Sequence, residues 1–136
     1  VTYILKVVIR LRIGNAVAYT NGNPVNLDVK PYLKYNQYTM VPFRFIAESL
    51  GAEVKWEEAT RKVSYSFRGV QIDLWIGKKN AEVTDATGKK RIVTLLAEPE
   101  IISGRTLVPL RFVSEAMGAK VDWDPKLWEA IISYPQ

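Results

Sequence analysis

Two pairs of oppositely charged residues are the first candidates for chemistry in this sequence. Arg44 and Glu48, and likewise Arg111 and Glu115, stand four positions apart, so in a helix each pair can form an ion pair. Two interpretations stay open. In the first, the arginine stacks on a tryptophan or bonds a loop carbonyl, and the glutamate anchors it. In the second, the pair is exposed and grips a ligand. We favour the first, because such pairs usually support a fold.

Aromatic side chains are the second candidates, and they point to ligand binding and not to catalysis. Trp75 is on the outward phase of a predicted strand, and Trp128 follows a polar turn. An exposed indole can stack on a sugar ring, so Trp75 and Trp128, with Tyr134 or Tyr19 nearby, would form a shallow carbohydrate site. In the alternative, which we favour, a loop or the other half of the chain covers these rings.

The residue types needed for most catalytic centres are missing. The 136 residues include no histidine and no cysteine, which excludes a copper centre, a Ser-His-Asp triad, a Cys-His pair, most zinc sites and disulfides. The acidic pairs Glu57-Glu58 and Asp122/Asp124 lie in predicted turns, where like charges are solvated. The second pair also lacks the glycine and distal glutamate of a calcium loop. We therefore predict no enzyme, no metal and no cofactor.

A sequence that occurs twice supplies the elements that position these residues. Thr39–Trp56 and Thr106–Trp123 are 67 positions apart and share ten of eighteen residues. Proline near the start and glycine after the end predict short helices over Pro42–Leu50 and Pro109–Met117. An apolar stripe on each should pack on a sheet, and the phenylalanine opposite indicates that the outer face is covered too. The structural residues of the repeat are Pro42, Arg44, Glu48, Gly51 and Trp56, with Pro109, Arg111, Glu115, Gly118 and Trp123; both tryptophans are predicted to be core or helix-packing residues. The stripes are Phe43, Ile46, Ala47 and Leu50, then Leu110, Val113, Ser114 and Met117.

Alternating apolar residues predict strands around each helix. Residues 5–13 and 70–76 each end at a glycine and lead into hairpins, the first turning at Asn21-Gly22. Residues 28–38 and 97–105 should loop back to the helices. Strands at 53–56 and 120–123 then lead to return strands at 62–67 and 129–134. Because Arg68-Gly69 turns 62–67 directly into 70–76, the repeat predicts that 129–134 pairs with 5–13, which would bring the chain ends together.

The repeated segment, with Val-Pro-Phe-Arg-Phe-Ile-Ala-Glu-Ser-Leu-Gly-Ala in its first copy, resembles the copper amine oxidase N-terminal-like domain, or stalk domain. The Leu-x-Ile-Gly ends of residues 11–14 and 74–77 fit as well, so the resemblance covers nearly the whole chain. Residues 34–38 depart from the short Asn-Gly-Arg turn of the family, whereas Ser103-Gly104-Arg105 keeps its form. The resemblance implies a small non-catalytic α+β module of exported bacterial proteins, often beside hydrolase, protease or surface-layer modules.

The charge is +5, from 19 basic and 14 acidic residues, and all the excess falls in residues 1–69. Lys6, Arg10 and Arg12 share the outward face of one predicted strand. They would either meet an anionic wall polymer or acidic polysaccharide, or, as we favour, protect a sheet edge from aggregation. No nucleic-acid-binding motif, signal peptide or membrane span is present. The chain begins at Val1, so we expect a piece of a longer protein.

These observations predict an α+β fold of two pseudo-twofold repeats, 1–69 and 70–136, each an antiparallel sheet packed on one short helix. The two repeats should fuse into a single compact domain over residues 1–136. The predicted function is a non-catalytic accessory module, a spacer or interaction domain of a larger exported bacterial protein. The alternative is a carbohydrate- or cell-wall-binding domain using Trp75, Trp128 and Tyr134. Expected partners are neighbouring domains and cell-wall polymer or polysaccharide, and the expected location is extracellular or at the cell surface.

Overall fold

Short strands with alternating burial build most of the molecule, as the period-two patterns predict. The computed structural model describes residues 6–135; Leu5, the predicted start of the first strand, lies outside them. One five-stranded sheet has the order β13-β14-β1-β2-β3 and a second the order β10-β9-β8-β7-β6, and every pairing in them is antiparallel. The first sheet contains β13 (Lys120–Asp124), β14 (Glu129–Tyr134), β1 (Val7–Arg12), β2 (Val17–Thr20) and β3 (Asn23–Asn26). The second contains β10 (Lys90–Thr94), β9 (Asn80–Thr84), β8 (Val70–Trp75), β7 (Lys62–Phe67) and β6 (Glu53–Glu57).

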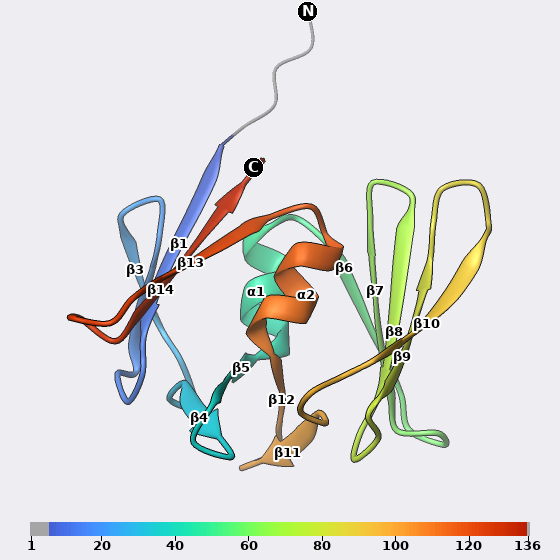
Figure 1. The fold of residues 1–136 in the computed structure, drawn as a ribbon, viewed down its shortest axis with the longest axis horizontal. Helices are drawn as coiled ribbons and strands as arrows, with labels where there is room; N and C mark the ends of the chain where they lie inside the picture. The colour runs from blue at the N-terminus through green and yellow to red at the C-terminus, as the bar shows by residue number, and fades with distance from the viewer. Residues whose placement is uncertain (1–5, 136) are drawn as a thin grey trace, which may run out of the picture.

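Two short helices lie between these sheets (Figure 1). They are α1 (Phe43–Ser49) and α2 (Leu110–Ala116). Pro42 and Pro109 have extended backbone and cap the helices, so each helix begins one residue later than predicted. Gly51 and Gly118 have φ values of +86° and +88°, as a residue just beyond a helix end requires. The predicted stripes are buried on both helices, and the fold is therefore α+β.

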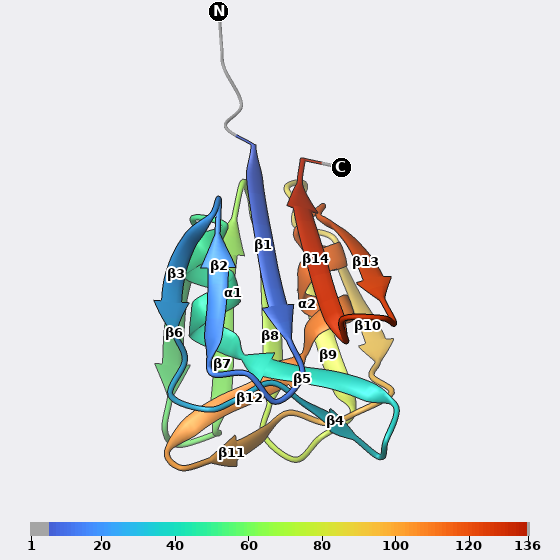
Figure 2. The same cartoon turned by 90° about the vertical axis from the view of Figure 1, so that its left-hand side faces the viewer.

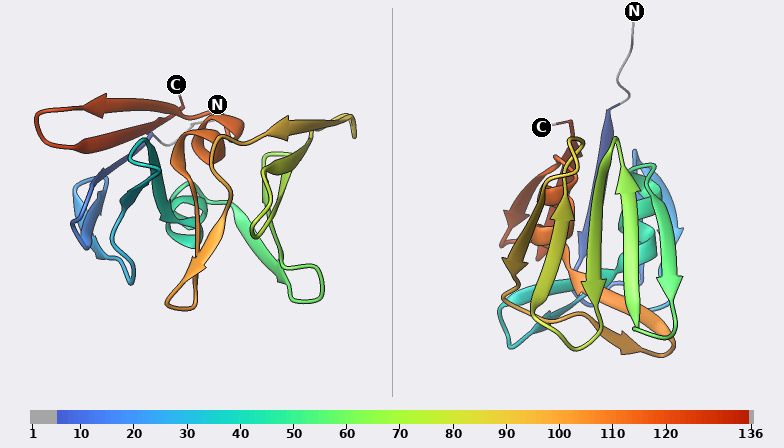
Figure 3. Two further views of the ribbon diagram at one scale, coloured as in Figure 1. Left: turned by 60° about the horizontal axis from the view of Figure 1, so that its bottom comes forward. Right: turned by 90° about the vertical axis from the view of Figure 1, so that its right-hand side faces the viewer.

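The pairing of the chain ends confirms the inference from the repeat. β1 pairs with β14, from Val7 opposite Tyr134 to Arg12 opposite Glu129, as β8 pairs with β7. Figure 2 shows β1 and β14 side by side in the first sheet, and Figure 3 shows the second sheet face-on. Each five-stranded sheet therefore draws strands from both halves of the chain. The prediction of one sheet for each repeat was wrong, because the return strand after each helix pairs with the other half.

A third sheet replaces the loops predicted at 28–38 and 97–105. Its order is β11-β12-β5-β4, and it runs across the lower ends of the other two sheets (Figure 2). The repeated sequence just before each helix forms its two central strands, which pair through Val41 and Val108. The sequence missed this sheet because its outer strands are three residues long. The four strands are β4 (Tyr32–Lys34), β5 (Tyr38–Pro42), β11 (Glu100–Ile102) and β12 (Arg105–Pro109).

One continuous core joins the helices to both five-stranded sheets, and its buried residues come from both halves of the chain. Tyr65 of β7 makes a polar contact inside it: the hydroxyl donates a hydrogen bond of 3.1 Å to the Val113 carbonyl of α2. Burial raises the pKa of the Tyr65 phenol, so it stays protonated and remains a donor. The second half is therefore fixed to the first by a directional bond as well as by apolar packing.

Two interpretations of surface residues were wrong. β1 is the central strand of its sheet, so its arginines do not protect an edge. Arg10 and Arg12 instead both bond Glu129 of β14, at 3.0 and 3.1 Å, and Glu129 is buried. Trp56 and Trp123 were predicted to be core or helix-packing residues, but they are 38% and 40% exposed and are not in the core. Their strands, β6 and β13, are the outermost of their sheets, which leaves one side of each ring open.

Candidate functional site

The outer face of each helix is the floor of an open hollow. The hollow over α2, here called the α2 groove, has a volume of about 860 Å³, and the hollow over α1, the α1 hollow, about 880 Å³. The α2 groove lies between the turn that joins β13 to β14 and the outermost strand β10. The α1 hollow lies between the turn that joins β6 to β7 and the outermost strand β3. The helix supplies Arg111, Phe112 and Glu115 to the α2 groove and Arg44, Phe45 and Glu48 to the α1 hollow. The sequence predicted that the outer face of each helix is covered. This is correct only for the two phenylalanines, which are partly buried against the core.

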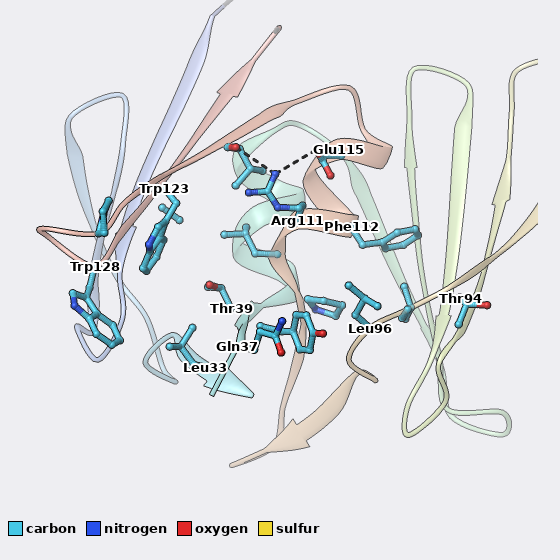
Figure 4. Close-up of a pocket in the computed structure, with 17 residues that line it drawn as sticks. Leu33, Gln37, Thr39, Thr94, Leu96, Arg111, Phe112, Glu115, Trp123 and Trp128 are labelled. Atoms are coloured by element: carbon cyan, nitrogen blue, oxygen red, sulfur yellow. Dashed lines mark hydrogen bonds and ion pairs between the residues drawn. The ribbon is translucent and has the colours of Figure 1, made fainter. Parts of the chain in front are cut away.

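Apolar side chains from three directions line the α2 groove (Figure 4). Trp123 of β13 and Trp128 of the following turn form one side, with ring centroids 6.4 Å apart and planes at 69°. Leu96, which follows β10, forms the opposite side, and Leu33 of β4 lies below. Leu96 is 68% exposed and Trp128 53% exposed, so much of this apolar surface is in contact with water. The indole N–H groups of both tryptophans donate no hydrogen bond within the described part of the chain.

A hydrogen-bonded cluster beside Leu33 holds this side of the groove in place. Lys34 forms ion pairs with Glu98 at 2.8 Å and with Glu100 at 2.9 Å. The hydroxyl of Tyr32 donates to Glu100 and that of Tyr35 donates to Glu98. The hydrogen bonds from Lys34 and then from Tyr35 lower the pKa of Glu98 to about 2. Glu98 is therefore ionised at neutral pH, and the segment before β11 is tied to β4.

The two arginine–glutamate pairs form as their spacing predicts. Arg44 lies 3.1 Å from Glu48 and Arg111 lies 3.5 Å from Glu115, and all four side chains are exposed. Arg111 also donates a long hydrogen bond of 3.5 Å to the carbonyl of Val121 in β13. The sequence suggested a bond to a loop carbonyl, but this acceptor is in a strand, and Arg44 forms no corresponding bond within the described residues. Whether the pairs also grip a ligand stays a prediction.

Charged residues line the α1 hollow at the positions where the α2 groove is apolar. In the repeat, Arg61 corresponds to Trp128 and Glu58 to Pro125. Asp28 follows the buried Leu27 as Leu96 follows the buried Leu95, and Asp28 is bonded to Arg105 at 2.7 Å. The indole of Trp56 donates to Glu58 at 2.6 Å. Most polar groups of the α1 hollow thus bond one another, whereas the apolar surface of the α2 groove is left open.

The structure does not bring the three predicted ligand-binding residues together. Trp128 lines the α2 groove, but Trp75 is partly buried on β8 in the other five-stranded sheet. Tyr134 lies at the far end of β14 from Trp128 and packs edge-on against Phe67, with centroids 5.1 Å apart. Of the residues that line the α2 groove, Trp128 was predicted as a ligand-binding residue, Trp123 was predicted as a core or helix-packing residue, and Leu96 was not predicted. A signal for Leu96 was present, since an apolar residue replaces Asp28 at this position of the repeat.

The described residues 6–135 contain no cluster of three or more acidic side chains suited to a metal ion. Within the same range, no helix is long and apolar enough to cross a membrane.

Comparison with known proteins agrees with the resemblance in the repeat. The profile described as copper amine oxidase N-terminal domain matches residues 5–64 and, in a second match, residues 19–132. The chain belongs to this family. The domain that defines this family is the non-catalytic N-terminal part of copper amine oxidases. A protein of Brevibacillus choshinensis named "Protease inhibitor" is 34% identical over 89 residues, which cover 65% of this chain. The chain spans about a quarter of that relative, 26% of its length.

Proposed function

We propose that this domain is a non-catalytic accessory module that holds an apolar segment of another polypeptide in the α2 groove. The observation that supports this most directly is the difference between the two hollows. Trp128 and Leu96 stand where the α1 hollow has Arg61 and Asp28. Exposing a tryptophan and a leucine to water is unfavourable by about 25 cal/mol for each Å² of apolar surface, and a bound partner would recover this energy.

The charges of the α2 groove favour an uncharged apolar segment as the occupant. Among the described residues that line it, the charged side chains are Arg111 and Glu115, and they neutralise each other. A charged segment would lose its hydration there without gaining a counterion. The name of the Brevibacillus relative, "Protease inhibitor", also favours a protein partner. We propose that the bound segment belongs to a neighbouring domain of the parent protein or to a second protein outside the cell.

The proposal extends to the organisation of the scaffold. We propose that residues 1–69 and 70–136 are two copies of one unit, related by an approximate twofold axis and fused into a single domain. Two features support it: α1 and α2 end in the same hydrogen-bond pattern, with Ala52 donating to Ala47 and Ala119 to Ser114, and the two five-stranded sheets have matching strand orders. Placement in a larger exported bacterial protein, outside the cell or at its surface, is part of the same proposal.

Binding of a carbohydrate or cell-wall polymer is the second candidate. The exposed rings of Trp123 and Trp128 offer a stacking surface, and their free indole N–H groups offer donors to sugar hydroxyls. The groove has few further polar groups, mainly Gln37, Thr39 and Thr94, and sugar sites need many. Trp75 and Tyr134 lie elsewhere, so this site would be smaller than the one that the sequence suggested.

The test converts the α2 groove into a copy of the α1 hollow. Peptides are selected for binding to the wild-type domain from a random phage-displayed library, and one is synthesised and titrated while tryptophan fluorescence is followed. The double variant Leu96→Asp/Trp128→Arg should bind the selected peptide at least about tenfold more weakly, since each buried large apolar side chain contributes about 1.5–3 kcal/mol. Ile101→Ser, which alters the α1 hollow, should bind normally.

The outcomes separate the two candidates. Unchanged peptide affinity in the double variant would refute the proposed use of the groove. Saturable binding of soluble cell-wall glycans that the double variant loses, with no apolar peptide selected, would support the second candidate. Far-ultraviolet circular dichroism of each variant shows that a loss of binding is not a loss of the fold.

A further inference from the structure

The β9–β10 hairpin has an open strand edge and an exposed aliphatic residue that the proposed use of the α2 groove does not explain. β10 is the outermost strand of its sheet, so alternate residues turn backbone N–H and C=O groups to its open edge. Ile92, in the middle of β10, is 72% exposed, more than any other large hydrophobic side chain in the described part of the chain. An open strand edge beside an exposed aliphatic side chain is the arrangement that pairs with an added strand.

Basic side chains without an ion pair in residues 6–135 also gather on this hairpin and on the turn before it. The sequence places the excess of basic residues before residue 70, but acidic residues of the second half neutralise much of it. Glu129 bonds Arg10 and Arg12, and Glu98 and Glu100 bond Lys34. The cations of the β9–β10 hairpin and of the turn before it form no ion pair within residues 6–135. These are Lys78, Lys79, Lys89, Lys90 and Arg91.

The acidic residues of the hairpin do not cancel this charge. Glu82 lies opposite Ile92 in the ladder, and Asp85 accepts hydrogen bonds from the backbone and hydroxyl of Thr87 and from the Lys89 amide. Against five cations, two carboxylates leave the hairpin, together with the turn before it, with a charge of +3. Protection of a sheet edge against aggregation explains the charges of Lys90 and Arg91. It does not explain why the next residue of β10, Ile92, is an exposed aliphatic residue.

The other outer strands of the two large sheets are less open. β3 contains Pro24, which cannot donate to a new ladder. Arg111 already bonds the Val121 carbonyl of β13. β6 carries Glu53, Lys55 and Glu57, so its charge is mixed. β10 is therefore the edge on which an open backbone, one sign of charge and an exposed aliphatic residue coincide.

We propose that β10 is a docking site for an acidic, extended polypeptide segment, which adds to the sheet as a sixth strand. Carboxylates of the segment would lie near Lys89, Lys90 and Arg91, and an apolar side chain would cover Ile92. A polyanionic glycan or polyphosphate would use the charge alone and would leave the strand edge and Ile92 unused. The observations therefore favour a polypeptide. This inference does not depend on the occupant of the α2 groove.

The probe is the peptide acetyl-Glu-Val-Glu-Val-Glu-Val-amide, titrated into the isotopically labelled wild-type domain and followed through backbone amide shifts in NMR spectra. We expect the largest shifts at 89–94. Peptides of the same sequence with an N-methyl group on every residue keep the charge but lose the backbone donors on both edges, and they should not bind. The double variant Lys90→Glu/Arg91→Glu should bind the first peptide about tenfold more weakly.

Matched controls make the result decisive. Lys30→Glu/Lys126→Glu changes the net charge by the same amount at two exposed lysines away from β10, and its affinity should stay within about twofold of wild type. Equal binding of the N-methylated peptides, of polyglutamate or of an anionic polysaccharide at the same residues would overturn the proposal, because charge alone would then account for binding. Shifts confined to other strands, or no binding at low ionic strength, would also overturn it.

Discussion

The hydrogen bond from Tyr65 to α2 gives a sharp test of how the two halves are joined. Val113 is near the end of α2, and the Met117 amide bonds the Ser114 carbonyl at 3.2 Å. In α1 the equivalent carbonyl, that of Ile46, accepts from the amide of Leu50. The Tyr65 hydroxyl, at 3.1 Å, thus takes the place of a helical bond. The position that corresponds to Tyr65 in the second copy is Ile132, which has no hydroxyl.

The variant Tyr65→Phe removes this donor and little else. The ring packs against Phe43 with centroids 5.2 Å apart, and phenylalanine keeps that contact. The buried Val113 carbonyl would lose its partner, so we expect the free energy of unfolding to fall by about 1–2 kcal/mol. For a chain of this length, that loss lowers the melting temperature by roughly 3–7 °C.

Urea unfolding followed by circular dichroism measures this change, with Tyr19→Phe as the matched control. The Tyr19 side chain is exposed and its hydroxyl forms no hydrogen bond in the described part of the chain. The control should therefore stay within about 0.5 kcal/mol of wild type. If Tyr65→Phe is equally neutral, the reasoning is refuted, because the Val113 carbonyl must then find another partner at no cost.

Three further predictions concern charged side chains. Glu98 has a pKa lowered to about 2 chiefly by its hydrogen bond from Lys34, so its stabilisation is complete above the unfolded-state pKa near 4.5 and is lost as the pH falls towards 2. Unfolding of Glu98→Gln, measured from pH 6 to 2, should accordingly show a weaker pH dependence than wild type, and an equal slope would contradict this assignment. Glu129→Gln should cost about 1–3 kcal/mol in chemical unfolding, because the buried carboxylate binds Arg10 and a second arginine; a neutral effect would show that solvent serves these arginines equally well. Arg44→Ala should change stability by less than about 1 kcal/mol, since its ion pair is exposed, and a larger loss would reveal a packing role that the structure does not show.

Much of the fold was predictable because its signals are local. Glycine after each helix and the Asn21-Gly22 turn need left-handed backbone, and both are found with positive φ. The pairing of β1 with β14 is not local, yet the repeat predicted it, since the Arg68-Gly69 turn fixes the same pairing in the other sheet. The third sheet escaped prediction because β4 and β11 are too short to show a period.

The candidate site was less predictable, because exposure depends on strand order. Trp123 occurs in both copies of the repeat, and a repeated tryptophan in a strand is reasonably expected in a core. It is exposed because β13 is outermost, and the period of the strand cannot show its place in the sheet. Trp75 has an outward phase but is partly buried, in agreement with the favoured interpretation that its ring is covered. The alternation of residues along a strand predicts to which face of the sheet a side chain points. Whether that face is exposed depends on the neighbouring strands and on what packs against them.

The outer faces of the two helices carry the same arginine, phenylalanine and glutamate in both copies, and the copies differ in the residues that surround those faces. Each helix is held by its buried stripe and by sheets built from both halves, and the stripe residues differ between the copies mostly by exchange of one apolar residue for another, such as Ile46 for Val113. The residues around the outer helix faces contribute little to that core and can change at small cost in stability. Charged residues fill one outer face with internal bonds, and aromatic and aliphatic residues leave the other open. A scaffold of this kind can retain its fold while only the α2 groove acquires a surface suited to a partner.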